Sequence, residues 1–512
     1  MLRLLPSLWD GEGAFARAYG DAVRERLIAV YHGAQARWCE AHGIALTGHP
    51  AEPDDLATAA GLHWPGQDTV WRWVLPGETS LTGPESTAPK TAASAARLKG
   101  APAVAEVLGA YGWRLTLDES KWLLDWYLSR GVSTLVMHAF YHSVRGGRAY
   151  ESEPDLGPHN SWWPHFPALV AYTARVAALY ESGTHRAATA VLADPEHVPD
   201  APARELLQHQ VDFFYLDPAR LTDAAIDAGT LTFGDQRFAA VIDLRPAALS
   251  LDPEADAVLK DFAASGGLVL GDTWSLPDLK GHLRTAGLAV DAAPAAPGLR
   301  VVRFDGPGGI VHACFNEGED PIATRLTLPA APDGVQWLDP FTGARTAAEH
   351  VGAQIALDLE RRQTKVLTGP AGLPDPPAHL ALGATFTLED WTGEPIRSLT
   401  AADPVPIGPG DWAAREDLRR FSGTYRYTTD IELPEGITDA VLDLGDVGEA
   451  AKVIVNGTEA GDLLWRPYTL TLRGLLRPGA NRIELLVSNS AANYYEGARR
   501  PSGLIGPVTL AC

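Results

Sequence analysis

Ionisable and aromatic side chains follow two apolar runs in the first 150 residues. Glu106 closes the run 101–105, and His138 closes a second run that Tyr141 and His142 follow closely. A glutamate is rarely buried without a partner, so Glu106 is either exposed on a loop or held there for acid–base chemistry. Imidazole and phenol groups can hydrogen-bond sugar hydroxyls or orient a carboxylate, and a hydrogen-bonded core histidine is an equal alternative.

Two further predicted strand ends carry the same residue types. One of these strand ends carries His49 and Glu52, and the other carries Asp68 and Trp71. The chain also has 15 tryptophans and 14 tyrosines, whose flat faces can stack on neutral ligands such as sugars. Trp162, in a loop rich in proline and tryptophan, either walls a sugar subsite or packs beneath the sheet.

Several other chemistries have little support. The three cysteines are far apart and the histidines at 42, 49 and 63 are not clustered, so we predict no disulfide framework and no metal site. No G-x-S-x-G elbow and no G-x-G-x-x-G loop between a strand and a helix occurs, which disfavours serine hydrolase and nucleotide chemistry.

Alternating elements in the first part of the chain must position these side chains. The pattern predicts strands over 44–48, 68–74, 101–106 and 133–139, with helices over 21–42 and 118–130. Strand, loop and helix in repetition indicate a parallel sheet. A closed (β/α)8 TIM barrel needs about 250 residues, so residues 1–183 are predicted to form only its C-terminal half.

The rest of the chain divides by composition, so the fold class is α/β plus all-β. Residues 184–300 predict a middle α/β domain of flavodoxin-like type, and 301–372 a small β module. The proline-rich segment 369–377 is a linker candidate. Residues 378–512 alternate as short strands, with an Asn456-Gly457 hairpin turn, and predict a β-sandwich of jelly-roll, galactose-binding-like type.

Charge and hydropathy limit the partners. The formal net charge is −22, which disfavours nucleic acid and anionic membranes. No apolar run is long enough to span a bilayer, and the first residues lack the features of a signal peptide, so we expect a cytoplasmic protein.

Motifs along nearly the whole chain resemble bacterial glycoside hydrolases related to the α-L-rhamnosidases of family 106. The first set covers residues 38–50, 65–73, 106–113, 130–132, 138–143 and 155–163. A second set resembles the sugar-binding jelly roll of family 2 enzymes and covers 421–427, 442–449, 455–457, 465–468 and 502–507.

The resemblance implies an O-glycosyl hydrolase, α-L-rhamnosidase-like or β-galactosidase-like, with its active site at the barrel mouth and Glu106 as the catalytic base or nucleophile. It implies an inverting mechanism and a calcium cofactor, for which no ligands can be mapped, and a middle domain that supports homo-oligomers in related enzymes. Its motifs imply carbohydrate contacts from His49, Gln67, Asp68, Trp71, Tyr111, His138 and Tyr141.

One departure from the family pattern concerns the second acid. Glycoside hydrolysis uses two carboxyl groups, and the family's partner of Glu106 lies on an earlier strand that would precede Met1. Glu52, Glu78 and Glu151 could substitute, but no motif marks them. Two hypotheses follow: a hydrolase whose N-terminal barrel strands are missing from this sequence, or an inactive remnant that binds carbohydrate without cleaving it.

Overall fold

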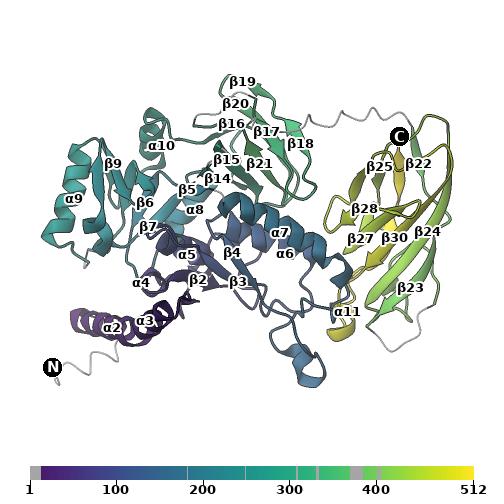
Figure 1. Ribbon diagram of the computed structural model, residues 1–512, viewed down its shortest axis with the longest axis horizontal. Helices are drawn as coiled ribbons and strands as arrows, with labels where there is room; N and C mark the ends of the chain where they lie inside the picture. Colours follow the sequence, from purple (N-terminus) through teal and green to yellow (C-terminus); the bar gives the residue numbers. More distant parts are fainter. Residues whose placement is uncertain are drawn as a thin grey trace.

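The computed structural model describes residues 13–181, 183–247, 249–306, 309–329, 334–369, 384–399 and 405–512. A β-sandwich lies at one end of the molecule and a long N-terminal helix at the other, with mixed α/β structure between them (Figure 1). Almost all of the predicted linker, 369–377, lies outside the described residues. No described helix is both long and apolar enough to cross a bilayer.

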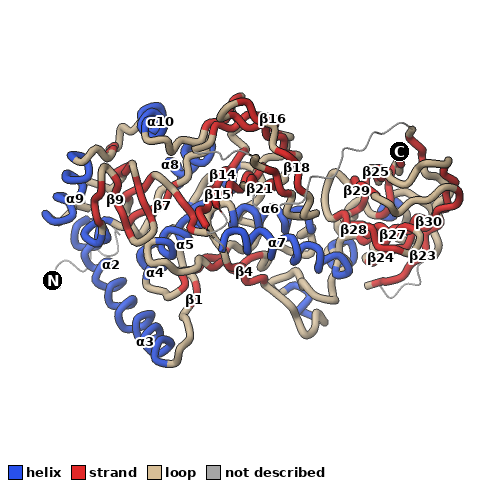
Figure 2. The backbone as a smooth tube through the Cα atoms, turned by 45° about the horizontal axis from the view of Figure 1, so that its top comes forward, coloured by secondary structure: helices blue, strands red, loops and turns tan. Residues whose placement is uncertain are grey.

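The N-terminal helix projects from the body of the protein (Figure 2). It comprises α2 (Gly13–Leu27), a π-helical turn (Ile28–His32) and α3 (Gly33–Ala41). Gly43 follows with φ +68°, which confirms the predicted helix end because glycine adopts this conformation without strain. The apolar side chains of this helix are largely exposed, with Trp38 58% and Val23 50% accessible.

Four parallel strands form an open sheet, and we call this part of the chain the half barrel after the fold expected for residues 1–183. They lie in the order β1 (Thr47–Gly48), β2 (Trp64–Asp68), β3 (Val104–Val107) and β4 (Thr134–Met137). The helices of this part are α4 (Leu56–Ala60), α5 (Ala88–Arg97), α6 (Leu117–Leu128) and α7 (Phe166–Glu181). The strand count and parallel order agree with the prediction, and β1 and β4 are the two edges of the sheet.

The predicted strand over 68–74 was wrong, because β2 ends where that strand was expected to begin. Trp71 and Arg72 have φ of +53° and +61°, in the left-handed region that an extended strand cannot accommodate. The residues after Asp68 therefore form a loop at the carboxyl end of β2 rather than part of the sheet.

The middle α/β domain contains a second parallel sheet in the order β12-β11-β6-β7, which is the flavodoxin-like order. Its strands are β6 (Thr189–Leu192), β7 (Phe213–Leu216), β11 (Ala240–Asp243) and β12 (Leu268–Leu270), and its helices are α8 (Asp200–Gln208), α9 (Pro253–Ala264) and α10 (Leu276–Thr285). A small antiparallel sheet, β8 (Ala225–Asp227), β9 (Thr230–Phe233) and β10 (Gln236–Phe238), lies beside it.

Two mostly antiparallel sheets form the β module that follows. The larger one consists, in spatial order, of β18 (Arg345–Ala347), β17 (Gln336–Leu338), β21 (Thr364–Thr368), β15 (Gly309–Asn316), β14 (Leu299–Gly306) and β5 (Thr184–Arg186). The smaller one consists, in spatial order, of β13 (Asp291–Ala293), β16 (Ile322–Thr327), β20 (Gln354–Leu359) and β19 (His350–Val351).

The C-terminal β-sandwich consists of two main sheets and a short strand pair. One sheet is β22 (Thr385–Thr387), β32 (Thr509–Ala511), β25 (Ala440–Asp443) and β29 (Thr469–Leu472). The other is β23 (Thr392–Ser398), β24 (Gly423–Leu433), β30 (Gly479–Ser488), β27 (Ala450–Val455) and β28 (Thr458–Leu463), and β26 (Asp446–Gly448) pairs with β31 (Gly503–Gly506). Asn456 and Gly457 both have positive φ, as the predicted type I′ turn requires.

The half barrel and the middle domain share one hydrophobic core. The helix α5 packs against both β2 and β7, and its buried alanines allow close approach on either side. The sandwich has its own core and docks through a short helix, α11 (Ala492–Tyr495), where Tyr495 stacks on Trp113 at 4.1 Å between ring centres.

Candidate active site

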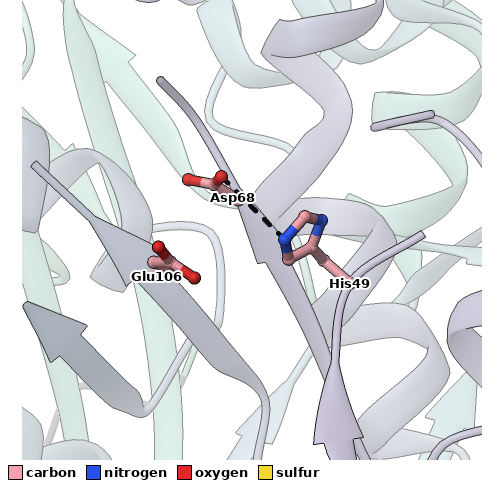
Figure 3. A group of neighbouring side chains, drawn as sticks. All are labelled: His49, Asp68 and Glu106. Carbon is pink, nitrogen blue, oxygen red and sulfur yellow. Dashed lines mark ion pairs between the residues drawn. The ribbon is translucent and has the colours of Figure 1, made fainter. Parts of the chain in front are cut away.

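The carboxyl ends of the first three strands bring His49, Asp68 and Glu106 together (Figure 3). Asp68 and Glu106 are direct partners in the parallel register of β2 and β3, so both carboxyl groups leave the sheet at the same edge. One nitrogen or oxygen of each of the three side chains lies within 4.8 Å of the others. His49 Nε2 is 4.0 Å from Asp68 Oδ2.

A chain of contacts orients Glu106. Its Oε1 lies 3.0 Å from His138 Nδ1, and the other ring nitrogen of His138 lies 3.2 Å from the hydroxyl of Tyr141. That hydroxyl donates to the carbonyl of Ser152, and the Tyr141 amide donates to the buried carboxylate of Asp155. Glu106 itself stays 37% accessible, so the chain holds the carboxylate while leaving it open to a ligand.

Burial changes the protonation of Asp68. Loss of solvation, followed by repulsion from Glu106, raises the pKa of Asp68 to about 6, against smaller opposing effects of His49 and His138. Its Oδ1 is buried and has no hydrogen-bond partner among the described residues. Glu85 lies near Asp68 and Glu52. Burial, followed by repulsion from these two carboxylates, raises the pKa of Glu85 to about 7. Protonated carboxyl groups are therefore present here at mildly acidic pH.

An aromatic loop follows Asp68. The Trp71 and Trp73 rings meet edge to face at 5.1 Å, and their residues are 64% and 45% exposed. Between them, Arg72 donates to the carbonyl of Tyr111 at 3.1 Å and forms an ion pair with Glu119. The ion pair fixes the loop while the two indoles remain available to a flat ligand face.

The structure places the predicted site residues in three groups. His49, Asp68, Glu106, His138 and Tyr141 form one cluster, and Trp71 follows it directly in the chain. Glu52 and His142 are exposed on the surface. The third group is buried and consists of Gln67, Tyr111 and Trp162.

Direct sugar contact by the three buried residues was a wrong expectation. Gln67, 2% exposed, donates to the carbonyl of Pro53, and Tyr111, 1% exposed, donates to the carbonyl of Val74. Trp162 is fully buried and stacks on Phe166, so the packing alternative holds for it. The polar groups of these side chains already donate hydrogen bonds to backbone carbonyls, so none of them is available to a ligand.

Sequence reasoning did not identify Asp68 as the acid nearest to Glu106. The predicted strand over 68–74 did not end on Asp68, so no strand register paired Asp68 with Glu106, although Asp68 was expected to contact the carbohydrate. The signal that could have identified it is register, because strands that end on Asp68 and Glu106 bring both acids to one edge.

The cluster also offers three possible ligands for a cation, which the spacing of the histidines in the sequence did not indicate. His49 supplies nitrogen and the two acids supply oxygen. Calcium prefers six to eight oxygen ligands, so one imidazole and two carboxylates fit it poorly, and imidazole is a better ligand for transition metals. We assign no step of the chemistry to a metal ion.

Comparison with known proteins places the fold. No protein-family model matches the chain. A protein of Formosa agariphila named "Putative beta-glucuronidase" is 23% identical over 166 residues, which are 32% of this chain and 13% of that protein. The solved structure of a rhamnosidase from Novosphingobium sp. PP1Y superposes with a TM-score of 0.72 at 19% identity, covering 95% of this chain and 55% of that one. The chain thus has the fold of about half of that glycoside hydrolase.

Proposed function

We propose that this chain is a glycoside hydrolase in which Glu106 acts on the anomeric carbon and Asp68 donates the proton to the leaving oxygen. The observation that carries the proposal is the pairing of two carboxyl groups at one strand edge in unlike environments. Asp68 is desolvated and has a pKa of about 6, whereas Glu106 is more open and contacts His138. Glycosidases use such a pair, with one carboxyl group protonated and the other ionised.

The two acids are close enough to act on one glycosidic bond, since one oxygen of each lies within 4.8 Å of the other. Direct attack of Glu106 on the anomeric carbon gives retention of configuration. The family resemblance implies inversion instead. Proton NMR of the first product anomer would distinguish the two outcomes.

The substrate class rests on the aromatic loop and on the similar proteins. Trp71 and Trp73 offer exposed indole faces in the loop that follows Asp68, which suits the apolar face of a pyranose or an aryl leaving group. Rhamnosides are our first candidate and glucuronides our second, because the two similar proteins are named for these activities.

Turnover of aryl α-L-rhamnosides, β-galactosides and β-glucuronides by the full chain tests the proposal. Glu106→Gln and Asp68→Asn should each lower kcat by at least about 100-fold, the size of losing an acid–base group. Glu52→Gln, which removes an exposed acid nearby, should change kcat by less than about threefold. Turnover that survives in both site variants would refute the assignment.

A carbohydrate-binding protein without hydrolysis is the second candidate. It rests on the exposed indoles of Trp71 and Trp73, which can hold the face of a sugar whether or not the two acids cleave a bond. Saturable glycan binding by the chain and by Glu106→Gln, with no turnover by either, would support this candidate over the first.

A further inference from the structure

A cavity of about 360 Å³ lies in the middle domain, at the amino ends of its parallel strands. Ala187 and Ala188 precede β6, Val211 precedes β7 and Ala239 precedes β11, and all four line the cavity. The strand-end cluster of the half barrel belongs to a different sheet, so this cavity is separate from the proposed active site. Its volume is within the range of small-molecule sites.

Cationic side chains outnumber carboxylates around the cavity. Arg186, Arg237, Lys280 and Arg303 line it, together with Asp212 and Asp305. Asp212 already pairs with two residues that do not line the cavity, the buried Lys90 and His185. The hollow therefore carries a local excess of positive charge in a chain of net charge −22, and such a potential attracts an anionic ligand.

The remaining carboxylates do not neutralise this charge. Asp305 alone serves two guanidinium groups, with Arg303 Nε at 2.7 Å and Arg186 Nε at 3.3 Å. Lys280 is 2.7 Å from Asp291, but Asp291 also accepts both hydrogen bonds of the Arg284 fork, at 2.8 and 2.9 Å. Each acid therefore faces two cations.

The side chain of Arg237 has no acidic partner. It projects from β10, where the residue is exposed to solvent, and within the described part of the chain the guanidinium makes no hydrogen bond or ion pair. Arg186 donates to the carbonyl of Asp235 in the same hairpin, which ties the two arginines to one wall of the cavity. A free guanidinium fork beside a second one suits a carboxylate, which it can bind through two parallel hydrogen bonds.

Apolar side chains complete the lining. Leu283 and Leu288, together with Val290 and Val301, come from α10, β14 and the segment between them, and the same two elements carry Lys280 and Arg303. We propose that this cavity binds a small organic carboxylate, with its head group on Arg237 and its hydrocarbon body against Leu288 and Val290. Both the charge and the apolar lining are required, so neither a neutral ligand nor a bare anion satisfies the site.

Calorimetric titration of the full chain with three probes tests the inference. We expect 4-phenylbutyrate to bind saturably, while its neutral amide and inorganic phosphate each bind at least about tenfold more weakly, which is the loss of one charge-assisted hydrogen bond or of the apolar contact. Arg237→Gln should weaken 4-phenylbutyrate by about tenfold or more. Leu288→Asp, at the partly exposed rim, should also weaken it by repulsion.

Arg220→Gln is the matched control, because Arg220 is already paired with Asp223 and does not line the cavity. It should bind 4-phenylbutyrate as the unaltered chain does. Equal binding of the acid and its amide, undiminished binding by Arg237→Gln, or no saturable binding of 4-phenylbutyrate up to millimolar concentration would each overturn the inference.

Discussion

At Asp68 the protein keeps a carboxyl group that is costly to ionise. The pKa rises from 3.8 to about 6, first because burial removes solvent and then because Glu106 lies beside it. A carboxyl group whose folded-state pKa is raised stabilises the fold fully below its unfolded pKa, and this contribution is lost as pH rises through the folded value. For Asp68 the loss falls between about pH 4 and pH 6.

Asp68→Asn should therefore stabilise the protein at neutral pH. We expect the free energy of unfolding at pH 7 to rise by about 1–3 kcal/mol, and the gain to vanish near pH 4, where the carboxyl group is already protonated. Denaturant titrations at the two pH values measure the difference. Asp227→Asn, at an exposed acid of β8, should change neither value, and an equal effect of Asp68→Asn at both pH values would contradict the explanation.

At the scale of single residues, the sequence predicted which side chains form the cluster better than it predicted which side chains are buried. Apolar runs that end in an ionisable residue marked Glu106 and His138, and the two side chains do meet at 3.0 Å. Burial of Gln67 and Tyr111 could not be predicted, because it depends on the carbonyls of Pro53 and Val74, which only the folded chain brings near them.

Among the elements, the loop after β2 depends most on a single interaction. Trp71 and Arg72 both adopt left-handed backbone conformations, which carry a cost of order 1 kcal/mol or more each for residues other than glycine. The Arg72–Glu119 ion pair and the hydrogen bond to the Tyr111 carbonyl hold them in place. The helix α6 thereby positions the indoles through Glu119 in its first turn.

Arg72→Gln should loosen this loop without touching the two acids. We expect KM for an aryl glycoside to rise by about tenfold while kcat changes by less than about threefold, because the loop binds the ligand and takes no part in proton transfer. Steady-state kinetics measures the two constants, with Arg26→Gln on the exposed N-terminal helix as the control. A fall in kcat with an unaltered KM would place Arg72 in the chemical step instead.

The same loop explains where element prediction failed. A run rich in valine and tryptophan after Asp68 has the composition of a strand, and composition does not reveal backbone handedness. The helix predicted over 118–130 had a regular apolar pattern, and α6 begins and ends within two residues of that prediction.

For the whole molecule, a buried charge network joins the half barrel to the β module. Glu317 accepts from Arg130 at 2.9 Å, from Arg300 at 2.7 Å and from the Ser80 hydroxyl at 2.6 Å. Burial alone would raise the pKa of Glu317, but the two guanidinium groups outweigh it and lower the pKa. Removing the carboxylate would leave two buried cations without their counter-charge.

Glu317→Gln should accordingly destabilise the protein by about 3–5 kcal/mol, as the loss of one member of a buried ion network typically does. Thermal unfolding followed by circular dichroism measures the effect. Glu319→Gln, in the exposed ion pairs with Arg361 and Arg362, should cost no more than about 1 kcal/mol. Similar losses in the two variants would mean that burial is not what gives Glu317 its importance.

The distribution of hydrophobic cores decides how the protein melts. One core runs without interruption from Val74 and Trp126 in the half barrel to Phe214 and Phe262 in the middle domain, and few of the described sandwich residues join it, namely Ala450, Leu464 and the partly buried Trp465. Half barrel and middle domain should then lose their structure in a single cooperative step, while the sandwich, with a core of its own, unfolds in another. Scanning calorimetry should resolve two endotherms, so a single melting temperature would not describe this protein.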